Sequence, residues 1–181
     1  MEIRCAMKRR NRKDVSMTES TWVKDRPVMP GMGTPESLEG TLEWSDVVAK
    51  LSAAKNYWII TASAAGVPHA VPMWAAFVNE TIYVSMGGRR ANRNVSSNPH
   101  ITIHLESGTD VVITEGTYEV GASIDPDTFN LIDAQFQEKY DWKPSNEPGY
   151  SATESGLKTV RLTRVIAWTS FPTDATRWTR V

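Results

Sequence analysis

The stretch YWIITASAAGVPHAVPMWAAFVNETIYVS, residues 57–85, decides the fold class. It holds three runs rich in β-branched and aromatic residues, separated only by short turns: 57–61, 67–78 and 81–85. Linkers this short join antiparallel strands, because parallel strands need a crossover of a dozen residues or more. Pro68 and Pro72 cannot donate to a ladder, so the second run is expected at an edge, at a bulge or beside a ligand.

The residues on both sides of this stretch predict helices and further strands. Before it, apolar residues at helical spacing from Trp44 to Leu51 predict a helix. After it, a short helix should end near Asn98, and Asp125-Pro126 is typical of an N-cap followed by proline at the first helical position. Further strands are predicted over three segments: 100–106, 111–120 and 157–169. Six or so strands with two or three short helices predict a mainly β protein, a closed or partly closed barrel.

The N-terminal part is expected to lie outside this barrel. Residues 17–41 are rich in proline and glycine and lack apolar periodicity, which predicts an extended segment without helix or strand. Residues 1–16 carry six basic and two acidic side chains and no apolar pattern, as in a disordered arm or an upstream translation start. The prediction is a disordered or extended segment over residues 1–41 and one β-barrel domain over residues 42–181, to which any binding site would belong.

Charge and composition exclude several classes of function. The 181 residues have a net charge of −1, and since residues 1–16 carry +4, the rest carries −5. An acidic body binds nucleic acid poorly, because neutralising phosphates drives that affinity. No apolar run approaches the ~18 residues of a membrane span, and the single Cys5 excludes an internal disulfide framework. We therefore expect a cytoplasmic protein with neither nucleic-acid nor membrane partners.

The three histidines do not predict a metal site. His100 and His104 are four residues apart in a predicted strand, which separates them by about 13 Å, too far to share one ion. His69 stands alone between Pro68 and Ala70. Composition leaves a Ser-His-Asp triad open, but no Gly-x-Ser-x-Gly elbow marks a catalytic serine.

A better candidate for chemistry is SMGGRRANRN, residues 85–94. A strand end supplies a hydroxyl, two glycines free the backbone, and a helix starts directly afterwards. Amides at a helix N-terminus with arginines nearby make a phosphate cradle, although arginine-rich loops after strands are more often only solvated. Trp58 and Trp74 lie on neighbouring predicted strands, where such rings usually fill a core or an interface but can also form a wall for a flat ligand.

The ordered set of motifs resembles one known superfamily over about residues 44–178. The segments that carry the resemblance are 56–61, 66–74, 82–85, Arg93-Asn94, Asn98-Pro99, 111–116, 139–142 and 175–178. In this order they are similar to the flavin-binding split-barrel superfamily, which contains pyridoxamine 5'-phosphate oxidase-like proteins and the flavin/deazaflavin-dependent oxidoreductases of actinobacteria.

The resemblance implies a six-stranded antiparallel split β-barrel of the FMN-binding type. It implies a homodimer with FMN or the deazaflavin F420 at the subunit interface, and a hydride-transferring oxidoreductase acting on a small organic substrate. No catalytic residue stands out, because the cofactor carries the hydride. The implied cofactor-binding residues are Val71, Pro72, Met73 and Trp74 beside the ring, Ser85, Arg89, Arg90, Arg93 and Asn94 at the phosphate, and Arg177 and Trp178 close by, from the same chain or from the partner chain.

The sequence departs from the family pattern in two places, and these departures limit which member of the family it can resemble. Relatives often carry lysine two residues before the Arg-Asn pair, where this chain has Ala91. The C-terminal Arg-x-His-based signature of pyridoxamine phosphate oxidase is missing, so that vitamin B6 enzyme is not expected. Two alternatives stay open: a non-catalytic flavin or deazaflavin carrier, and a haem- or tetrapyrrole-handling protein of the same fold.

Overall fold

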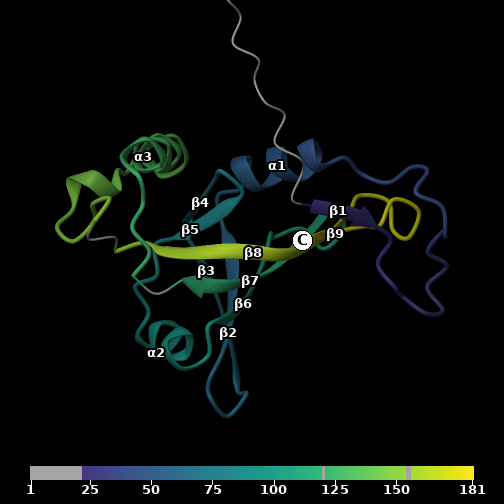
Figure 1. Cartoon of the computed structure of the whole chain (residues 1–181), viewed down its shortest axis with the longest axis horizontal. Coiled ribbons are helices and arrows are strands. Elements are labelled where there is room, and N and C mark those ends of the chain that lie inside the picture. The colour runs from purple at the N-terminus through teal and green to yellow at the C-terminus, as the bar shows by residue number, and fades with distance from the viewer. Residues whose placement is uncertain (1–21, 120, 154–155) are drawn as a thin grey trace, which may run out of the picture.

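The computed structural model describes residues 22–119, 121–153 and 156–181, and the expectations for residues 1–21 lie outside these ranges. Within these ranges, three α-helices and one 3-10 helix accompany a single antiparallel sheet (Figure 1). The helices are α1 (Trp44–Ala53), α2 (Arg89–Ser97), α3 (Pro126–Tyr140) and η1 (Pro144–Asn146). The strands are β1 (Trp22–Asp25), β2 (Tyr57–Ala62), β3 (Pro68–Met73), β4 (Ala75–Val78), β5 (Thr81–Val84), β6 (His100–His104), β7 (Val111–Glu119), β8 (Lys158–Trp168) and β9 (Thr176–Arg180).

The strand pairing closes a barrel of six strands. The predicted run over residues 67–78 is one bent strand, broken at Trp74 into β3 and β4. Its first half pairs with β2 and its second half with β5, and the ladder returns through β8, β7 and β6 to β2. Every pairing is antiparallel, so the predicted mainly β, split-barrel fold class is confirmed. As its two prolines require, β3 pairs along its length with β2 alone.

Two strands were not predicted. Trp22–Asp25 was expected to be extended without strand structure, yet it forms β1 and pairs with β9, which in turn pairs with β8. The reason is a tertiary contact: Trp22 is buried, and its ring packs at a tilt against Trp44 with ring centroids 4.8 Å apart. Side-chain contacts therefore hold a four-residue strand that local propensity alone does not specify.

The core divides into two clusters. The larger fills the barrel and includes Tyr57, Ile59 and Trp178, all almost fully buried. The smaller lies under α3, where Ile132 and Phe136 pack on the outer side of the β4–β5 hairpin. Asp125 caps α3 as predicted, accepting a hydrogen bond of 2.9 Å from the amide of Thr128.

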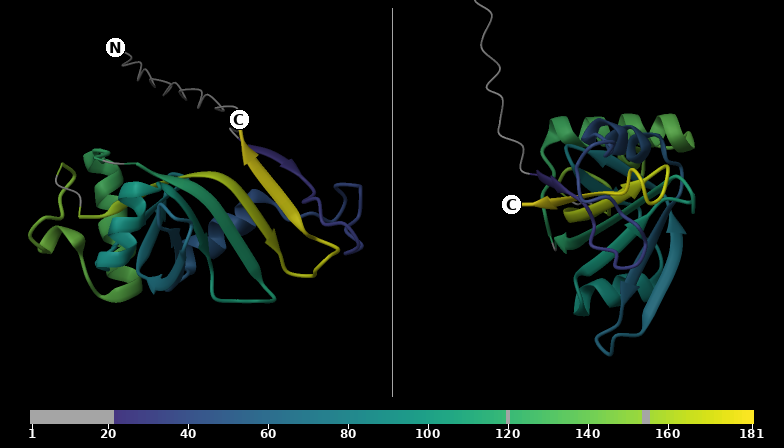
Figure 2. Two further views of the ribbon diagram at one scale, coloured as in Figure 1. Left: turned by 90° about the horizontal axis from the view of Figure 1, so that it is seen from below. Right: turned by 90° about the vertical axis from the view of Figure 1, so that its right-hand side faces the viewer.

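The helices cover different sides of the barrel. Figures 1 and 2 show α1 and α3 together on one side and α2 on the opposite side. The predicted helices beginning at Trp44 and ending near Asn98 are α1 and α2. Within the described ranges no helix has the length and apolar character to cross a membrane.

Candidate functional site

The loop between β5 and α2 forms an open helix N-terminus. Gly87 and Gly88 are exposed, and Asn92 closes the loop by donating to the carbonyls of Met86, at 2.9 Å, and Gly88, at 3.2 Å. No residue in the described ranges accepts a hydrogen bond from the first three helical amides, at residues 89–91. Three parallel amides at the positive end of a helix dipole suit an anionic group.

Three arginines lie in the first two turns of this helix. Arg89 and Arg93 are exposed and four residues apart, which places them on one side of α2. Within the described part of the chain neither is paired with a carboxylate. Arg90 donates from Nη2 to the carbonyl of Pro68 at 3.3 Å. That bond ties the helix to β3, while the positive charge of all three side chains remains available to an anion.

The wall predicted on β3 lies next to this loop. The Met73 Cε atom is 3.7 Å from the place that a Cβ atom would take at Gly88, so the strand and the loop are in van der Waals contact. The amide of Ser85 donates to the carbonyl of Trp74 at 3.0 Å. Val71 and Met73 alternate with the exposed Pro72 along the strand. The structure therefore brings residues 71–74, Ser85 and the α2 arginines to one edge of the barrel.

Aromatic side chains beyond the predicted set complete this edge. Trp74 is 45% exposed and stacks on Tyr140, with ring centroids 4.6 Å apart and an interplanar angle of 8°. Trp142 lies 6.2 Å from Trp74, and Tyr150 packs edge-on against Trp142 at 5.5 Å. The Tyr150 hydroxyl is 3.4 Å from Ser85 Oγ. The only signal for these residues in the sequence is the density of aromatic residues over 140–150.

Three predicted site residues lie elsewhere. Asn94 is 2% exposed and donates from Nδ2 to Thr61 Oγ1 at 3.0 Å, so its amide fastens α2 to β2. Trp178 is 2% exposed, and its ring packs on Trp44 inside the barrel. Arg177 donates to both carboxylate oxygens of Asp25. Within one chain, β9 pairs with residues 164–167 of β8, whereas Val84, next to Ser85, pairs with Lys158 at the other end of β8, so neither Arg177 nor Trp178 lies at the edge described above.

The buried amine of Lys139 contacts the peptide that follows Trp74. Lys139 Nζ donates to the Tyr57 hydroxyl at 3.0 Å and to the carbonyl of Ala75 at 3.2 Å. Burial lowers the pKa of Lys139 to about 8, and burial also raises the pKa of Tyr57. In the described ranges Lys139 has no carboxylate partner. Its charged form is stabilised instead by its two hydrogen bonds and by the Tyr57 ring, whose centroid is 5.0 Å from Nζ.

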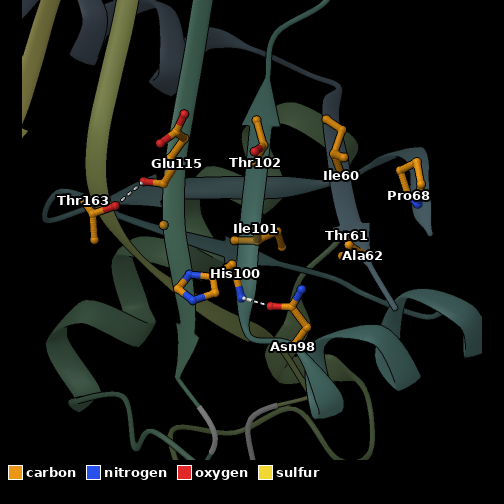
Figure 3. Close-up of a pocket in the computed structure, with 11 residues that line it drawn as sticks. Ile60, Thr61, Ala62, Pro68, Asn98, His100, Ile101, Thr102, Glu115 and Thr163 are labelled. Atoms are coloured by element: carbon orange, nitrogen blue, oxygen red, sulfur yellow. Dashed lines mark hydrogen bonds between the residues drawn. The ribbon is translucent and has the colours of Figure 1, made fainter. Parts of the chain in front are cut away.

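A separate cleft of about 290 Å³ lies on the outer face of the sheet (Figure 3). Glu115 lines it and forms an ion pair with Arg164, and Thr163 Oγ1 donates to the Glu115 carbonyl at 3.2 Å. The other lining residues come from β2, β3, β6, β7 and the end of α2: Ile60, Thr61, Ala62, Pro68, Asn98, His100, Ile101, Thr102 and Gly116. A cation-binding group of three or more histidine, cysteine or acidic residues does not occur in the described ranges.

Comparisons with known proteins agree with the fold. No protein-family model matches the sequence, and a search of curated proteins finds no match. Among solved structures, a FAD-binding protein from Mesorhizobium loti is 17% identical with a TM-score of 0.52, covering 77% of this chain and 96% of that one. A conserved hypothetical protein from Mycobacterium tuberculosis is 18% identical with a TM-score of 0.54, covering 75% and 89%. A heme binding protein from Mycobacterium smegmatis is 16% identical with a TM-score of 0.50, covering 68% and 53%.

These likenesses establish the architecture. The chain has the split-barrel fold of the pyridoxamine 5'-phosphate oxidase-like proteins, as its resemblance to that superfamily predicts. At identities this low, the relatives show the shape of the barrel and not its chemistry.

Proposed function

We propose that this protein is an oxidoreductase that binds FMN or the deazaflavin F420 and transfers a hydride to or from a small organic substrate. One observation carries the proposal: α2 begins with three open amides and has three arginines in its first two turns, with no carboxylate partner in the described ranges. Although residues 17–181 carry a net negative charge, no carboxylate of the described ranges neutralises these arginines. Their free positive charge favours an anionic group such as a cofactor phosphate. The FAD-binding neighbour of the same fold supports a flavin-type cofactor.

The residues present fit such a group. Arg89, Arg90 and Arg93 would hold the phosphate by charge-assisted hydrogen bonds, and the Ser85 hydroxyl lies at the near end of the same loop. Val71 and Met73 would provide an apolar wall along the ring, since they share one face of β3 and, among the described strands, β3 is unpaired on the side away from β2; Pro72 lies on the opposite face. When bound, the cofactor supplies the hydride chemistry, and the chain binds it, orients it and keeps water from its ring.

The outer face of the sheet supports a homodimer. One row across β3, β2, β6 and β7 presents mostly apolar side chains that are exposed, at Pro72, or half-exposed, at Trp58, His104 and Ile113. The cleft of Figure 3 opens on the same face. A second copy packed there would shelter both features.

A haem-binding role is the second candidate. His104 Nδ1 lies 2.7 Å from the carbonyl of Leu105, and its ring stacks on Trp58 with centroids 6.2 Å apart. A histidine held this way through Nδ1 presents Nε2 to a metal. The heme binding protein with the same fold gives this reading a precedent. A non-catalytic flavin carrier would use the α2 cradle without any substrate.

Absorbance titrations of the purified protein with FMN, F420 and haem separate these candidates. The proposal expects saturable binding of FMN or F420 that is lost on Arg93→Ala and retained in Arg161→Ala, an exposed arginine of β8. Turnover of bound, reduced cofactor with an added electron acceptor then distinguishes an enzyme from a carrier. Binding of haem alone, abolished by His104→Ala and unaffected by Arg93→Ala, would replace the proposal with the second candidate.

A further inference from the structure

Side chains of α3 complete the hydrogen bonding along the edge of β4 that faces away from β5. The Gln135 side chain accepts a hydrogen bond from the amide of Phe77 at 2.7 Å and donates to its carbonyl at 2.9 Å. Two residues earlier in the strand, the amide of Ala75 donates to the Tyr140 hydroxyl at 3.0 Å, and its carbonyl accepts from Lys139 Nζ at 3.2 Å. Because residues two apart in a strand direct their peptide groups to the same edge, these helix side chains take the place of a neighbouring strand.

The contacts at Ala75 hold the bend beside the proposed cofactor wall. Ala75 is the first residue of β4, directly after the break in the bent strand, and Met73 of the wall contacts the loop before α2. The Tyr140 hydroxyl also lies 3.0 Å from the Ala75 carbonyl, but its one hydrogen is shared with the carbonyl of Lys55, at 2.7 Å. The carbonyl at this bend therefore depends mainly on Lys139 as its donor.

Lys139 carries its charge in a buried place. It is 9% exposed, its second hydrogen bond is to the Tyr57 hydroxyl at 3.0 Å, and no carboxylate in the described ranges pairs with it. The titratable groups that interact with it or with its partners are Tyr57 of β2 and, on its own helix, Tyr140 and the exposed Glu138. From β4 it meets only the Ala75 carbonyl.

The proton on this amine is sensitive to nearby charge. Burial lowers the pKa of Lys139 to about 8 and raises the pKa of both Tyr57 and Tyr140, so only the amine among these three groups changes charge near neutral pH. Solvent screens a buried charge poorly, so an anion bound at the adjoining edge favours the protonated amine.

We propose that Lys139 is a positioning residue of the cofactor site, which fixes the bend at Ala75 and takes up a proton from solvent when the anionic cofactor binds. This inference rests on the proposed function, and Lys139 acts through the bend and through its charge rather than by touching the cofactor. Because the bound anion stabilises the ammonium, the proton and the cofactor strengthen each other's binding. Affinity for the cofactor is therefore highest below the pKa of Lys139 and falls as the pH rises through it.

The first experiment needs no cofactor. The protein is labelled with 5-fluorotryptophan, and the Trp74 fluorine signal, assigned as the one missing in Trp74→Phe, is followed by NMR from about pH 6.5 to 9.5. We expect this signal to shift with a midpoint near pH 8, because Lys139 Nζ is bonded to the peptide that follows Trp74. The shift should persist in Lys55→Met, which removes an exposed amine, and vanish in Lys139→Met. A Trp74 signal that does not move, or that still moves in Lys139→Met, overturns the inference whether or not a cofactor binds.

The second experiment measures cofactor binding by isothermal titration calorimetry. Titrations at pH 8 in buffers of different ionisation enthalpy give the number of protons taken up by the parent protein. We expect uptake of a fraction of one proton with FMN and none with riboflavin, which lacks the phosphate. Between about pH 7 and 9 the Kd of FMN should rise about 3- to 10-fold, the scale of one weakly screened charge interaction. The rise should remain in Lys55→Met and be absent in Lys139→Met.

The outcomes separate this inference from the proposed function. FMN binding that is lost in Arg93→Ala, yet takes up no proton and does not change with pH, overturns the inference and leaves the proposed function standing. Equal proton uptake with FMN and riboflavin also overturns it, because the anion then plays no part. If neither FMN nor F420 binds, both fail. If Lys139→Met does not fold, the proton uptake of the parent protein with FMN and with riboflavin still decides.

Discussion

The arginines of α2 and the arginines of the last two strands show opposite uses of the same side chain. On β8 and β9 each of four arginines is paired with a carboxylate: Arg161 with Glu119, Arg164 with Glu115, Arg177 with Asp25 and Arg180 with Glu80. On α2, Arg89 and Arg93 have no such partner in the described ranges. The chain has as many acidic as basic residues, so a lack of carboxylates does not explain why the α2 arginines form no ion pair. We therefore assign the α2 arginines, which lie beside open amides, a binding role, whereas the paired arginines join strands to one another.

Lys139 is a third kind of cation: it is buried and has no carboxylate partner in the described ranges. Its titration should give the largest effect on the free energy of unfolding. Its folded-state pKa of about 8 lies below the ordinary value of 10.5, so the unfolded chain holds its proton more tightly. The free energy of unfolding should therefore rise as the pH increases from about 8 to 10.5, by up to about 3 kcal/mol from this group. Urea unfolding across this range measures the slope.

Substitutions assign that slope to one side chain. Lys139→Met should lack the rise, because methionine does not titrate, whereas Lys55→Met, at an exposed lysine, should retain it. An identical pH dependence in Lys139→Met and in the parent protein would show that the amine keeps an ordinary pKa in the fold.

Arg93→Ala should have the next largest effect, and on binding rather than on stability. Loss of one charge-assisted hydrogen bond to a phosphate costs about 1.5–3 kcal/mol, or roughly 10- to 150-fold in the Kd of FMN or F420. Arg93→Lys should recover part of this loss, since an ammonium keeps the charge but not the planar fork. Turnover at saturating cofactor should fall much less. Isothermal titration calorimetry gives the affinities, and unchanged Kd values would leave Arg93 a merely solvated side chain.

Arg177→Ala should show the reverse pattern. Its two hydrogen bonds to Asp25 join β9 to β1, and the pair is only partly exposed, so we expect a loss of about 1 kcal/mol in unfolding free energy. Cofactor affinity in the monomer should not change. A substantial loss of affinity with normal stability would mean that Arg177 reaches the site from the partner subunit, as the resemblance to the superfamily implies.

Arg161→Ala should have the smallest effect. The side chain is 59% exposed and its partner Glu119 is 32% exposed, so solvent screens most of their attraction. We expect a change in unfolding free energy within about 0.5 kcal/mol and no change in binding. Thermal unfolding in low and high salt checks this value. A larger, salt-insensitive loss would show that paired surface arginines contribute more to the fold than the comparison with α2 assumes.

Much of the barrel could be predicted from local pattern. The bent strand and the prolines of β3 are local features, as is the N-cap at Asp125. In contrast, β1 depends on Trp22 meeting Trp44 and on Asp25 meeting Arg177, contacts that no local propensity encodes.

The candidate site divides in the same way. Glycines and arginines over residues 85–94 mark the loop directly, and the structure shows its open amides. Asn94 shares that motif but faces inward, because its partner Thr61 lies 33 residues away in sequence on β2. Tyr140 and Tyr150 reach this edge only through the packing of α3 and the loop after it. Polar groups in one short motif can thus separate into ligand-facing and structural roles.

The most direct test of the α2 cradle compares cofactors with and without their phosphate. The Kd of FMN and of riboflavin is measured for the parent protein and for Arg89→Ala/Arg93→Ala, with F420 and its phosphate-free deazaflavin riboside as a second pair. The account predicts that the parent protein prefers the phosphorylated member at least about 10-fold, the scale of one charge-assisted hydrogen bond, and that the variant loses most of this preference. A ratio that is the same in both proteins would contradict it.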